Sequence, residues 1–466
     1  MEEKVEFEGY WWIPENRENK HFGKLIKENN EYHLHLYGSF HDNPMNESDL
    51  NVIHGESSNG KEISLMGNIY RSTHGSIPGI PQKKYKTRLV FIGKLYNSLN
   101  EIAFNKYVVR YTYLTEWINI SGFKVEYNPK ATEFNITYKH PEIIESKPIT
   151  DFILIIDFDL QGPTFPILNN VIISQGCAFI FKFEEEKDIK SFFSLNSLIE
   201  DFLSLAIGQP IFQKSIEGFS PDNVRKIHDT EINDPVQIIL PSKSTENTSE
   251  KTIDIRDMVF QYKSIRDNIE IFLRHWIEKS KELKLIYNLY FHIVYKSGIS
   301  IDNKLNILLK IIEIYHRKFI NNKEMDEKEY KKMIKEIQEA LPEKYLDWFN
   351  RKISFIGNQP SLSIRLHDIL EKYSFITDEL IEDRNDFVNK AKRIRNYFTH
   401  FTGNEKDEPD VIDIVQITRK LNIIVESIFL REIGFDDDMN KKIVMRQWNL
   451  KYNRDFTIYG PLPEDG

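Results

Sequence analysis

A run of basic residues in the C-terminal half of the sequence is followed at once by an asparagine and, shortly after, a histidine. Four of the six residues at positions 390–395 are cationic, although the chain carries a formal net charge of −9. An arginine stays charged and its forked donors fit phosphate oxygens, whereas a histidine exchanges protons near neutral pH. Arg395 and His400 are therefore candidate catalytic residues for phosphate chemistry, with Asn396 as a candidate third member.

The chemistry that suits these residue types is cleavage of RNA without a metal. It requires a base for the 2′-hydroxyl proton, an acid for the 5′-oxygen, and positive charge on the phosphate as it becomes pentacoordinate. A histidine in the acid–base role typically contributes about 10²- to 10⁴-fold in rate, and Arg395 would stabilise the charge. The need for a 2′-hydroxyl predicts RNA rather than DNA as the substrate.

The five-residue spacing from Arg395 to His400 determines whether the two side chains can meet. On a continuous helix, five residues correspond to about 140° of rotation and 7.5 Å of rise, so the side chains of Arg395 and His400 would diverge. They can converge if the helix ends near His400, and the pair Gly403-Asn404 just beyond is typical of a helix end. The alternative is a solvated helix face whose last histidine interacts only with the helix dipole.

Further cations precede Arg395. Lys390, Lys392 and Arg393 are candidate RNA contacts. A solvated, purely structural face explains such a cluster equally well. The acidic remainder of the chain would repel bulk nucleic acid and so favour a local, selective site.

Length and composition indicate a two-domain soluble protein. Single cores stop growing beyond about 250–300 residues, and this chain has 466. One cysteine, Cys177, excludes an intrachain disulfide framework and a zinc site built from several cysteines. The N-terminal residues lack the order of a signal peptide, and no apolar run is long enough to span a bilayer. We expect a cytoplasmic protein with no membrane partner.

The N-terminal half is predicted to be β-rich over residues 1–250. Short alternating or apolar runs, separated by Gly, Asn, Asp and Pro, indicate a sandwich or a barrel. An apolar segment at helical spacing, residues 192–205, predicts a helix packed against that sheet. A polar stretch at 241–251 predicts an exposed linker between the domains.

The C-terminal half is predicted to be an all-α bundle over residues 251–450, followed by a flexible tail at 451–466. The fold class is therefore α+β in two domains. Amphipathic periodicity predicts helices at 258–281, 285–296, 305–319, 327–340, 361–373, 376–399 and 411–432.

The segment from Arg395 to His400 resembles the Arg-X4-6-His signature, commonly with Asn after the Arg, of the HEPN superfamily, whose active members are metal-independent endoribonucleases. The N-terminal half is similar to the β-rich domain that precedes HEPN in the ApeA-like branch. The similar segments are residues 7–14, 22–25, 53–55 and 59–65, so the resemblance extends over nearly the whole chain.

The resemblance implies an arrangement of the site. HEPN nucleases pair two chains so that both Arg–His sets face one cleft, which implies a homodimer or higher homo-oligomer and supplies two histidines for two proton transfers. Asn396 would orient His400 or a phosphate, and Thr399 would help to cap the helix. Glu313 lies in a segment similar to the family's Glu-X-Tyr element; a buried, paired carboxylate that only stabilises the bundle is the alternative.

The resemblance also implies a biological role. It suggests bacterial defence against phage by cleavage of host RNA, tRNA being one candidate, with the β-rich domain sensing a phage-derived trigger or restraining the nuclease. No cofactor or metal is expected. One alternative is a non-catalytic HEPN dimerisation or RNA-binding module. A third is a metal hydrolase built on the N-terminal histidines, which are His21, His33, His35, His41, His54 and His74.

Overall fold

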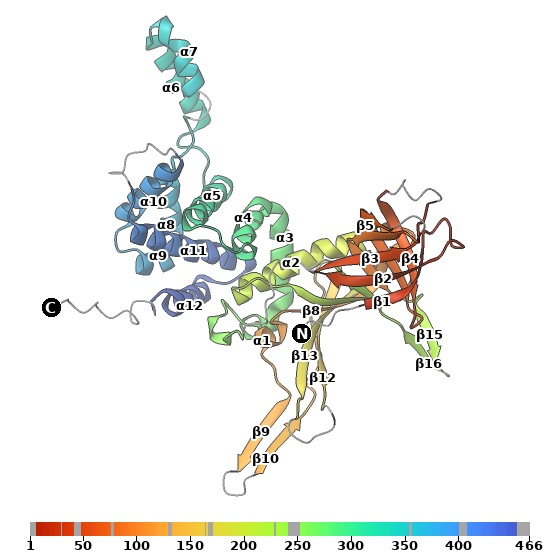
Figure 1. Ribbon diagram of the computed structural model, residues 1–466. Helices are drawn as coiled ribbons and strands as arrows, with labels where there is room; N and C mark the ends of the chain where they lie inside the picture. Colours follow the sequence, from red (N-terminus) through yellow and green to blue (C-terminus); the bar gives the residue numbers. More distant parts are fainter. Residues whose placement is uncertain are drawn as a thin grey trace, which may run out of the picture. The chain divides into compact units, whose positions relative to one another are not determined.

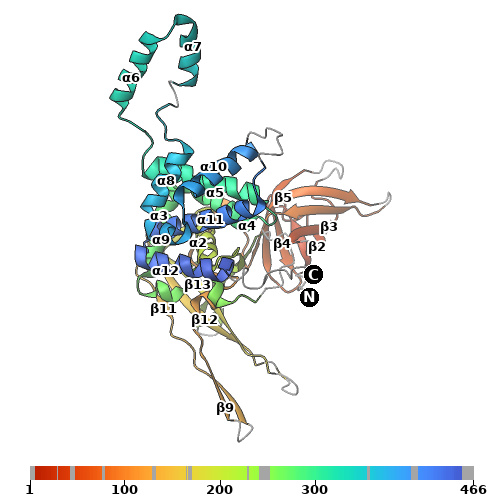
Figure 2. The same cartoon turned by 90° about the vertical axis from the view of Figure 1, so that its left-hand side faces the viewer.

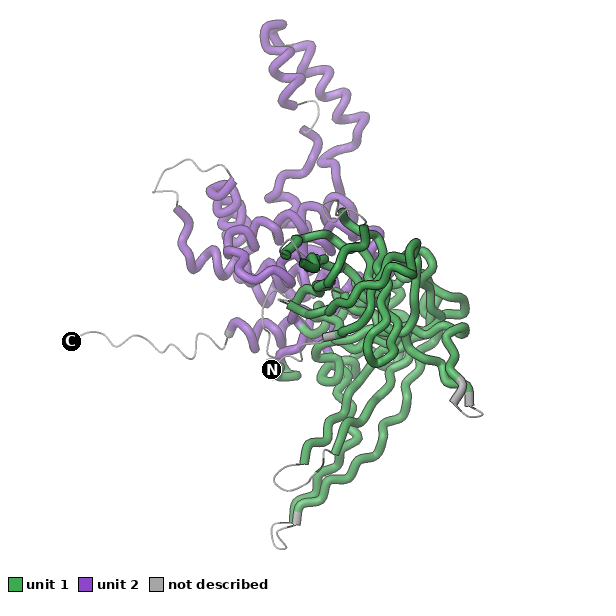
Figure 3. The backbone as a smooth tube through the Cα atoms, turned by 45° about the vertical axis from the view of Figure 1, so that its right-hand side comes forward, with its two compact units in different colours: residues 1–207, 211–256, 261–274 green, residues 208–210, 257–260, 275–466 purple. Residues whose placement is uncertain are grey.

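The computed structural model falls into two compact units (Figure 3). The first comprises residues 1–207, 211–256 and 261–274, and the second residues 208–210, 257–260 and 275–466. The structure describes residues 6–28, 30–41, 48–75, 79–128, 133–163, 165, 171–227, 230–240, 252–353, 357–399 and 408–453. The predicted linker at 241–251 and positions 454–466 of the predicted tail lie outside the described residues.

The first unit begins with a closed β-barrel (Figure 1). Its strands are β1 (Glu6–Trp12), β2 (His21–Glu28), β3 (Glu31–Tyr37), β4 (Leu50–Ser57), β5 (Glu62–His74) and β6 (Gln82–Thr87). They follow the order β5-β4-β1-β2-β3-β6, and the pairing of β5 with β6 closes the ring. Alternating residues fill the interior, among them Trp11, Leu25, Leu34, Ile53, Leu65 and Tyr85. Of the two architectures predicted for this region, the barrel is the one found.

The sheet continues from the barrel through β5 into a second group of strands. These are β7 (Leu89–Ile92), β17 (Val236–Ile239), β14 (Gln213–Phe219), β8 (Ala103–Tyr111), β13 (Ser174–Asp188), β12 (Phe152–Gln161) and β11 (Ile144–Glu145), in that spatial order. The predicted helix at 192–205 is confirmed as α2 (Ile189–Ile207). It packs on this sheet, and the ring of Phe192 stacks on that of Tyr107 with centroids 3.5 Å apart.

Shorter elements complete the first unit. The helix α1 (Leu114–Ile118) contacts β13, and two separate hairpins pair β9 (Phe123–Asn128) with β10 (Glu133–Tyr138) and β15 (Val224–Ile227) with β16 (Thr230–Asn233).

The second unit is helical (Figure 2). Its long helix α11 (Val411–Ile433) is buried along most of its length and packs against α5 (Ile301–Phe319). Around this pair lie α4 (Lys284–Tyr295), α8 (Leu362–Lys372), α9 (Ser374–Leu380), α10 (Arg384–Thr399), α12 (Asp437–Trp448) and the part of α3 (Ile269–Glu282) from residue 275 onward. A hairpin of α6 (Glu327–Ala340) and α7 (Glu343–Lys352) is inserted between α5 and α8. The predicted α+β class, a β-rich region followed by a helical bundle, is confirmed.

Two of the predicted helices are wrong in extent. The segment 258–281 is not one helix, because 3₁₀ turns at Tyr262–Ser264 and Arg266–Asn268 precede α3. Residues 258–260 precede these turns, and all three are buried without belonging to a helix. The segment 376–399 is divided into α9 and α10. Its break coincides with Asp383, whose carboxylate accepts hydrogen bonds from the backbone N–H groups of Asn385 (2.8 Å) and Asp386 (3.0 Å) and so caps a new helix.

Candidate active site

The helix α10 carries most of the candidate residues. One face of it packs into the bundle through Phe387, Val388, Ala391 and Ile394, in contact with α8, α11 and α5. The positions Lys392, Arg395, Asn396 and Thr399 follow the spacing i, i+3, i+4, i+7, so they form a strip along a different face of the helix. The packing of α10 thus leaves Arg395 and Asn396 half-buried and Lys392 and Thr399 exposed.

Arg395 faces a carboxylate from another helix. Its Nη2 lies 4.0 Å from Oε1 of Glu313 on α5, and the side chains of Arg395 and Glu313 are 36% and 28% exposed. A partly exposed ion pair at this distance contributes little to stability. Because its side chain is 36% exposed, the guanidinium of Arg395 can still donate hydrogen bonds to an anion that approaches from solvent. The structure therefore brings two of the predicted site residues, Arg395 and Glu313, together.

The end of α10 leads directly to the predicted histidine. The hydroxyl of Thr399 donates a hydrogen bond of 2.7 Å to the carbonyl oxygen of Arg395, which ties the last described turn together. His400, the next residue, lies outside the described residues. Its role beside Arg395 stays a prediction, as does the orienting role of Asn396.

Two of the three candidate RNA-binding cations turn toward α11. The Nζ of Lys390 lies 3.1 Å from Asp386 and 3.1 Å from Asp413, and Nη2 of Arg393 lies 3.8 Å from Asp413. Hydrogen bonds to Asp386, and then to Asp413, raise the pKa of Lys390 above its usual value. A phosphate would have to compete with these carboxylates. Lys392, by contrast, forms no ion pair with any residue that the structure describes, and it shares the strip with Arg395.

A buried network next to Glu313 has no counterpart in the sequence prediction. His316, one turn after Glu313 on α5, is fully buried. Its Nδ1 accepts a hydrogen bond from Nη1 of Arg365 (3.0 Å), because an arginine can only donate. Its Nε2–H then donates to Oδ2 of Asp368 (2.7 Å). Both ring nitrogens are therefore occupied, so His316 is a structural residue that fixes α5 against α8. Arg365 and Asp368 are three residues apart and therefore lie on the same face of α8, and this spacing is the feature of the sequence that could have indicated the contact.

Arg365 also contacts a second group in the bundle. Arg365 is 3% exposed, and besides His316 its guanidinium donates to the carbonyl oxygen of Pro360 (3.0 Å). Burial is the main cause that lowers the pKa of Arg365; the nearby Arg317 lowers it further, whereas Glu313 raises it. Glu313 thus acts electrostatically on the buried network.

We expect Arg365→Ala to lower the free energy of unfolding of the helical unit by about 1.5–3 kcal/mol, because it leaves the buried Nδ1 of His316 without its donor. Chemical denaturation followed by circular dichroism measures this. The matched control is Arg317→Ala, an exposed arginine on the same helix as His316, which should change stability little. Equal effects of the two substitutions would contradict the structural role of Arg365.

The tyrosine of the Glu-X-Tyr element is also structural. Tyr315 donates a hydrogen bond of 2.8 Å to Oε1 of Glu432, and its hydroxyl lies 3.0 Å from that of Tyr373. Burial, and then the neighbouring Tyr373, raises the pKa of Tyr315 far above its ordinary value. Of the two side chains in this element, Glu313 is therefore the one that reaches the candidate site.

The N-terminal histidines do not gather as metal ligands would. His33 lies 3.6 Å from Glu31 on the same strand, β3, and His35, also on β3, lies 3.2 Å from Glu28 on β2. Across the described ranges, no group of three or more His, Cys, Asp or Glu side chains is arranged to hold a metal ion. None of the helices in those ranges combines the length and apolar character needed to cross a membrane.

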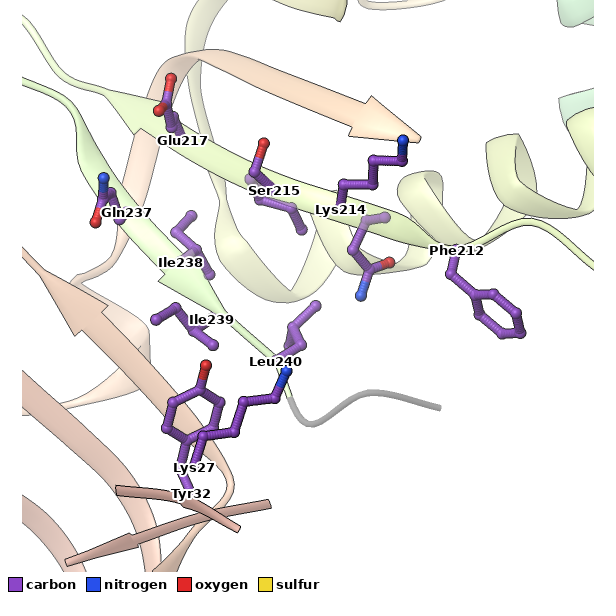
Figure 4. Close-up of a pocket in the computed structure, with 12 residues that line it drawn as sticks. Lys27, Tyr32, Phe212, Lys214, Ser215, Glu217, Gln237, Ile238, Ile239 and Leu240 are labelled. Carbon is purple, nitrogen blue, oxygen red and sulfur yellow. The ribbon is translucent and has the colours of Figure 1, made fainter. Parts of the chain in front are cut away.

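The β-rich unit has a pocket of its own (Figure 4). It has a volume of about 370 Å³ and is bounded by Lys27 and Tyr32 of the barrel and by residues of β14 and β17. The strand β14 contributes the charged side chains of Lys214 and Glu217 to its wall, and β17 contributes the apolar side chains of Ile238 and Ile239. This mixed lining suits a partly polar ligand and includes none of the predicted site residues.

Comparisons with known proteins match both units. The family model described as ApeA N-terminal domain 1 matches residues 6–276, and the one described as Apea-like HEPN matches residues 307–439. The second match contains α10, Glu313 and the segment that ends at His400. No curated protein and no solved structure is significantly similar to the chain.

Proposed function

The chain belongs to the ApeA-like HEPN family, and on this premise we propose that it is a metal-independent endoribonuclease. The observation that supports the proposal is the partly exposed guanidinium of Arg395, which lies 4.0 Å from Glu313 and precedes His400 by five residues in the sequence. In this proposal Arg395 stabilises the phosphate, His400 transfers protons, and Asn396 orients one of them.

The proposed reaction uses the RNA's own 2′-hydroxyl as the nucleophile. A neutral histidine removes the 2′-hydroxyl proton, the 2′-oxygen attacks phosphorus, and the bond from phosphorus to the 5′-oxygen breaks. A protonated histidine donates its proton to that 5′-oxygen, so the products are a 2′,3′-cyclic phosphate and a 5′-hydroxyl. Arg395 donates hydrogen bonds to the phosphate oxygens as negative charge builds up on them.

The proposed reaction needs two proton transfers, but each chain has a single His400. We therefore propose that the protein acts as a homodimer. Pairing two chains would bring two copies of Arg395 and His400 to one cleft, where one imidazole acts as base and the other as acid. Two imidazoles that interact in one cleft titrate as a coupled pair, so a pH–rate profile would report the pair rather than a single residue.

The family also supports a role in anti-phage defence. We propose that the β-rich unit restrains the nuclease or senses a phage-derived trigger, and that the helical unit then cuts host RNA, with tRNA as a candidate. A nuclease directed at its own cell's RNA requires such control.

The proposal predicts RNA cleavage that does not depend on a metal. Purified chain incubated with total RNA in excess EDTA should produce fragments with 5′-hydroxyl ends at the rate measured without EDTA. Sequencing gels and end-labelling by polynucleotide kinase measure both properties.

The other outcomes separate the alternatives. Loss of cleavage in EDTA would contradict the proposed chemistry and favour a metal hydrolase. RNA binding without any fragments, together with expression that arrests growth equally in wild type and Arg395→Ala, would favour a non-catalytic RNA-binding module.

A further inference from the structure

The helical hairpin of α6 and α7 is a structure within the helical unit that has its own small core. Tyr330, Ile334 and Phe349 form a buried cluster, and Met333 and Leu341 pack against it. Figures 1 and 2 show the hairpin projecting from the bundle, joined to it through the end of α5 and the start of α8. Because the hairpin has its own core, the side chains on its outer faces do not have to pack against the bundle.

The outer face of α7 carries only cations and aromatic residues. At 100° per residue, the positions Lys344, Tyr345, Trp348, Arg351 and Lys352 occupy one continuous third of the helix circumference, and all five are exposed. The acidic residues of α7, Glu343 and Asp347, fall outside that third. We call these five residues the α7 strip.

The two aromatic side chains of the α7 strip are exposed to solvent. Tyr345 is 48% exposed and Trp348 is 57% exposed, one turn apart on the same face. Other aromatic side chains, such as Tyr127, are equally exposed, so the feature that suits a binding surface is the combination of two rings with cations on one face. The Nζ of Lys344 lies 4.8 Å from the centroid of the Tyr345 ring, which puts positive charge at the aromatic face.

The lysines of α6 are paired with carboxylates on the same helix, unlike the cations of the α7 strip. On α6, Lys331 lies 3.3 Å from Glu327, Lys332 lies 4.0 Å from Glu336 and Lys335 lies 3.8 Å from Glu339. These are i, i+4 pairs that neutralise one another along the helix. On the α7 strip, neither lysine nor Arg351 forms an ion pair with any acidic residue in the described part of the chain. The strip is thus a local positive surface on an acidic protein.

We propose that the α7 strip binds unpaired nucleotides of RNA. Exposed rings that stack on bases, flanked by cations that contact phosphates, are how proteins hold single strands without reading a paired duplex. This inference rests on the proposed function and extends it, because it assigns the substrate class: an RNA with a single-stranded segment beside the cleavage point. Cations beside Trp and Tyr would also suit a surface of acidic lipid. Binding of the chain to anionic vesicles but not to a single-stranded oligoribonucleotide would therefore overturn the proposal.

Binding and cleavage are measured separately, so that the two proposals can fail separately. In chains carrying His400→Ala, which cannot cut if the proposed function is right, fluorescence anisotropy with a labelled single-stranded oligoribonucleotide gives the affinity. The double substitution Tyr345→Ala/Trp348→Ala should weaken binding about 5- to 150-fold per stacked base lost, the equivalent of about 1–3 kcal/mol. Trp348→Phe should retain most of the affinity, because a phenyl ring still stacks.

The cations are tested against a matched set. Lys344→Gln/Arg351→Gln/Lys352→Gln should make the dependence of log affinity on log salt concentration less steep by about 2, since each phosphate contact on a single strand contributes about 0.7. Lys331→Gln/Lys332→Gln/Lys335→Gln removes the same charge from the ion-paired helix and should leave both the affinity and the slope near wild type. Circular dichroism confirms that each variant folds.

The outcomes decide between the proposals. If the two α7 variants bind as tightly as the α6 control, or if duplex RNA binds as well as single strands, the α7 strip is not a single-strand site. If either result is obtained while the wild-type chain still cuts RNA in EDTA, this inference is wrong and the proposed function is unaffected. If the unaltered chain neither binds nor cuts any RNA, both it and the proposed function are overturned.

Discussion

Replacing His400 with alanine is expected to lower the rate of RNA cleavage by about 10²- to 10⁴-fold, because the site then lacks the group that moves protons to and from the RNA oxygens. Single-turnover cleavage of a labelled RNA measures the effect. RNA affinity should change little, because an imidazole at neutral pH contributes little charge to the complex.

The matched control is His292→Ala. His292 is an exposed histidine on α4 in the same unit, so its removal tests whether any histidine substitution slows the reaction. It should leave the rate within a few fold of wild type. A His400→Ala chain that cuts as fast as His292→Ala would contradict the assignment of the general acid–base.

Arg395→Ala is expected to lower the cleavage rate by about 10²- to 10³-fold, the usual loss when a donor aimed at developing charge is removed. Arg395→Lys should recover only part of this, because an ammonium lacks the planar fork that fits two phosphate oxygens. The same single-turnover assay measures both substitutions.

Arg393→Ala is the control for charge alone. Arg393 is only two residues away and equally cationic, but it faces Asp413 on α11 at 3.8 Å. Its loss should change the cleavage rate by no more than a few fold. Equal defects from Arg393→Ala and Arg395→Ala would mean that general positive charge, not the position of one guanidinium, supports the reaction.

Much of the fold follows from periodicity in the sequence. The alternation in β3 and the helical spacing in α6 predicted those elements because each has one face more buried than the other. The apolar residues of α2 and α11 also recur at helical spacing, although residues 202–207 and 421–430 are buried on all sides. Closure of the barrel did not follow, because it depends on pairing between β5 and β6, which no local pattern encodes. The helix α7 was not predicted either. It is short, and its exposed aromatic residues lie outside the face that Phe349 buries, so the apolar residues of its sequence show no clear helical period.

The site was predictable only in part. The residue types and the resemblance predicted Arg395 as a site residue, and the resemblance to the Glu-X-Tyr element predicted Glu313. Their approach to 4.0 Å depends on how α10 and α5 are rotated about their axes. The same rotation decides that Lys390 and Arg393 meet Asp413 while Lys392 shares the face of Arg395. Sequence spacing gives positions relative to one helix and cannot give the partner across the interface.

We propose that one active site contains Arg395 and His400 from two chains. Single-turnover cleavage of RNA in EDTA by a mixed dimer of one wild-type chain and one His400→Ala chain tests this most directly, since the shared cleft then holds one imidazole in place of the two that act as base and acid. We expect the mixed dimer, isolated with two different affinity tags, to cut RNA at least about 10²-fold more slowly than the wild-type dimer. A mixed dimer that keeps half or more of the wild-type rate would contradict the shared site, because each chain would then be active by itself.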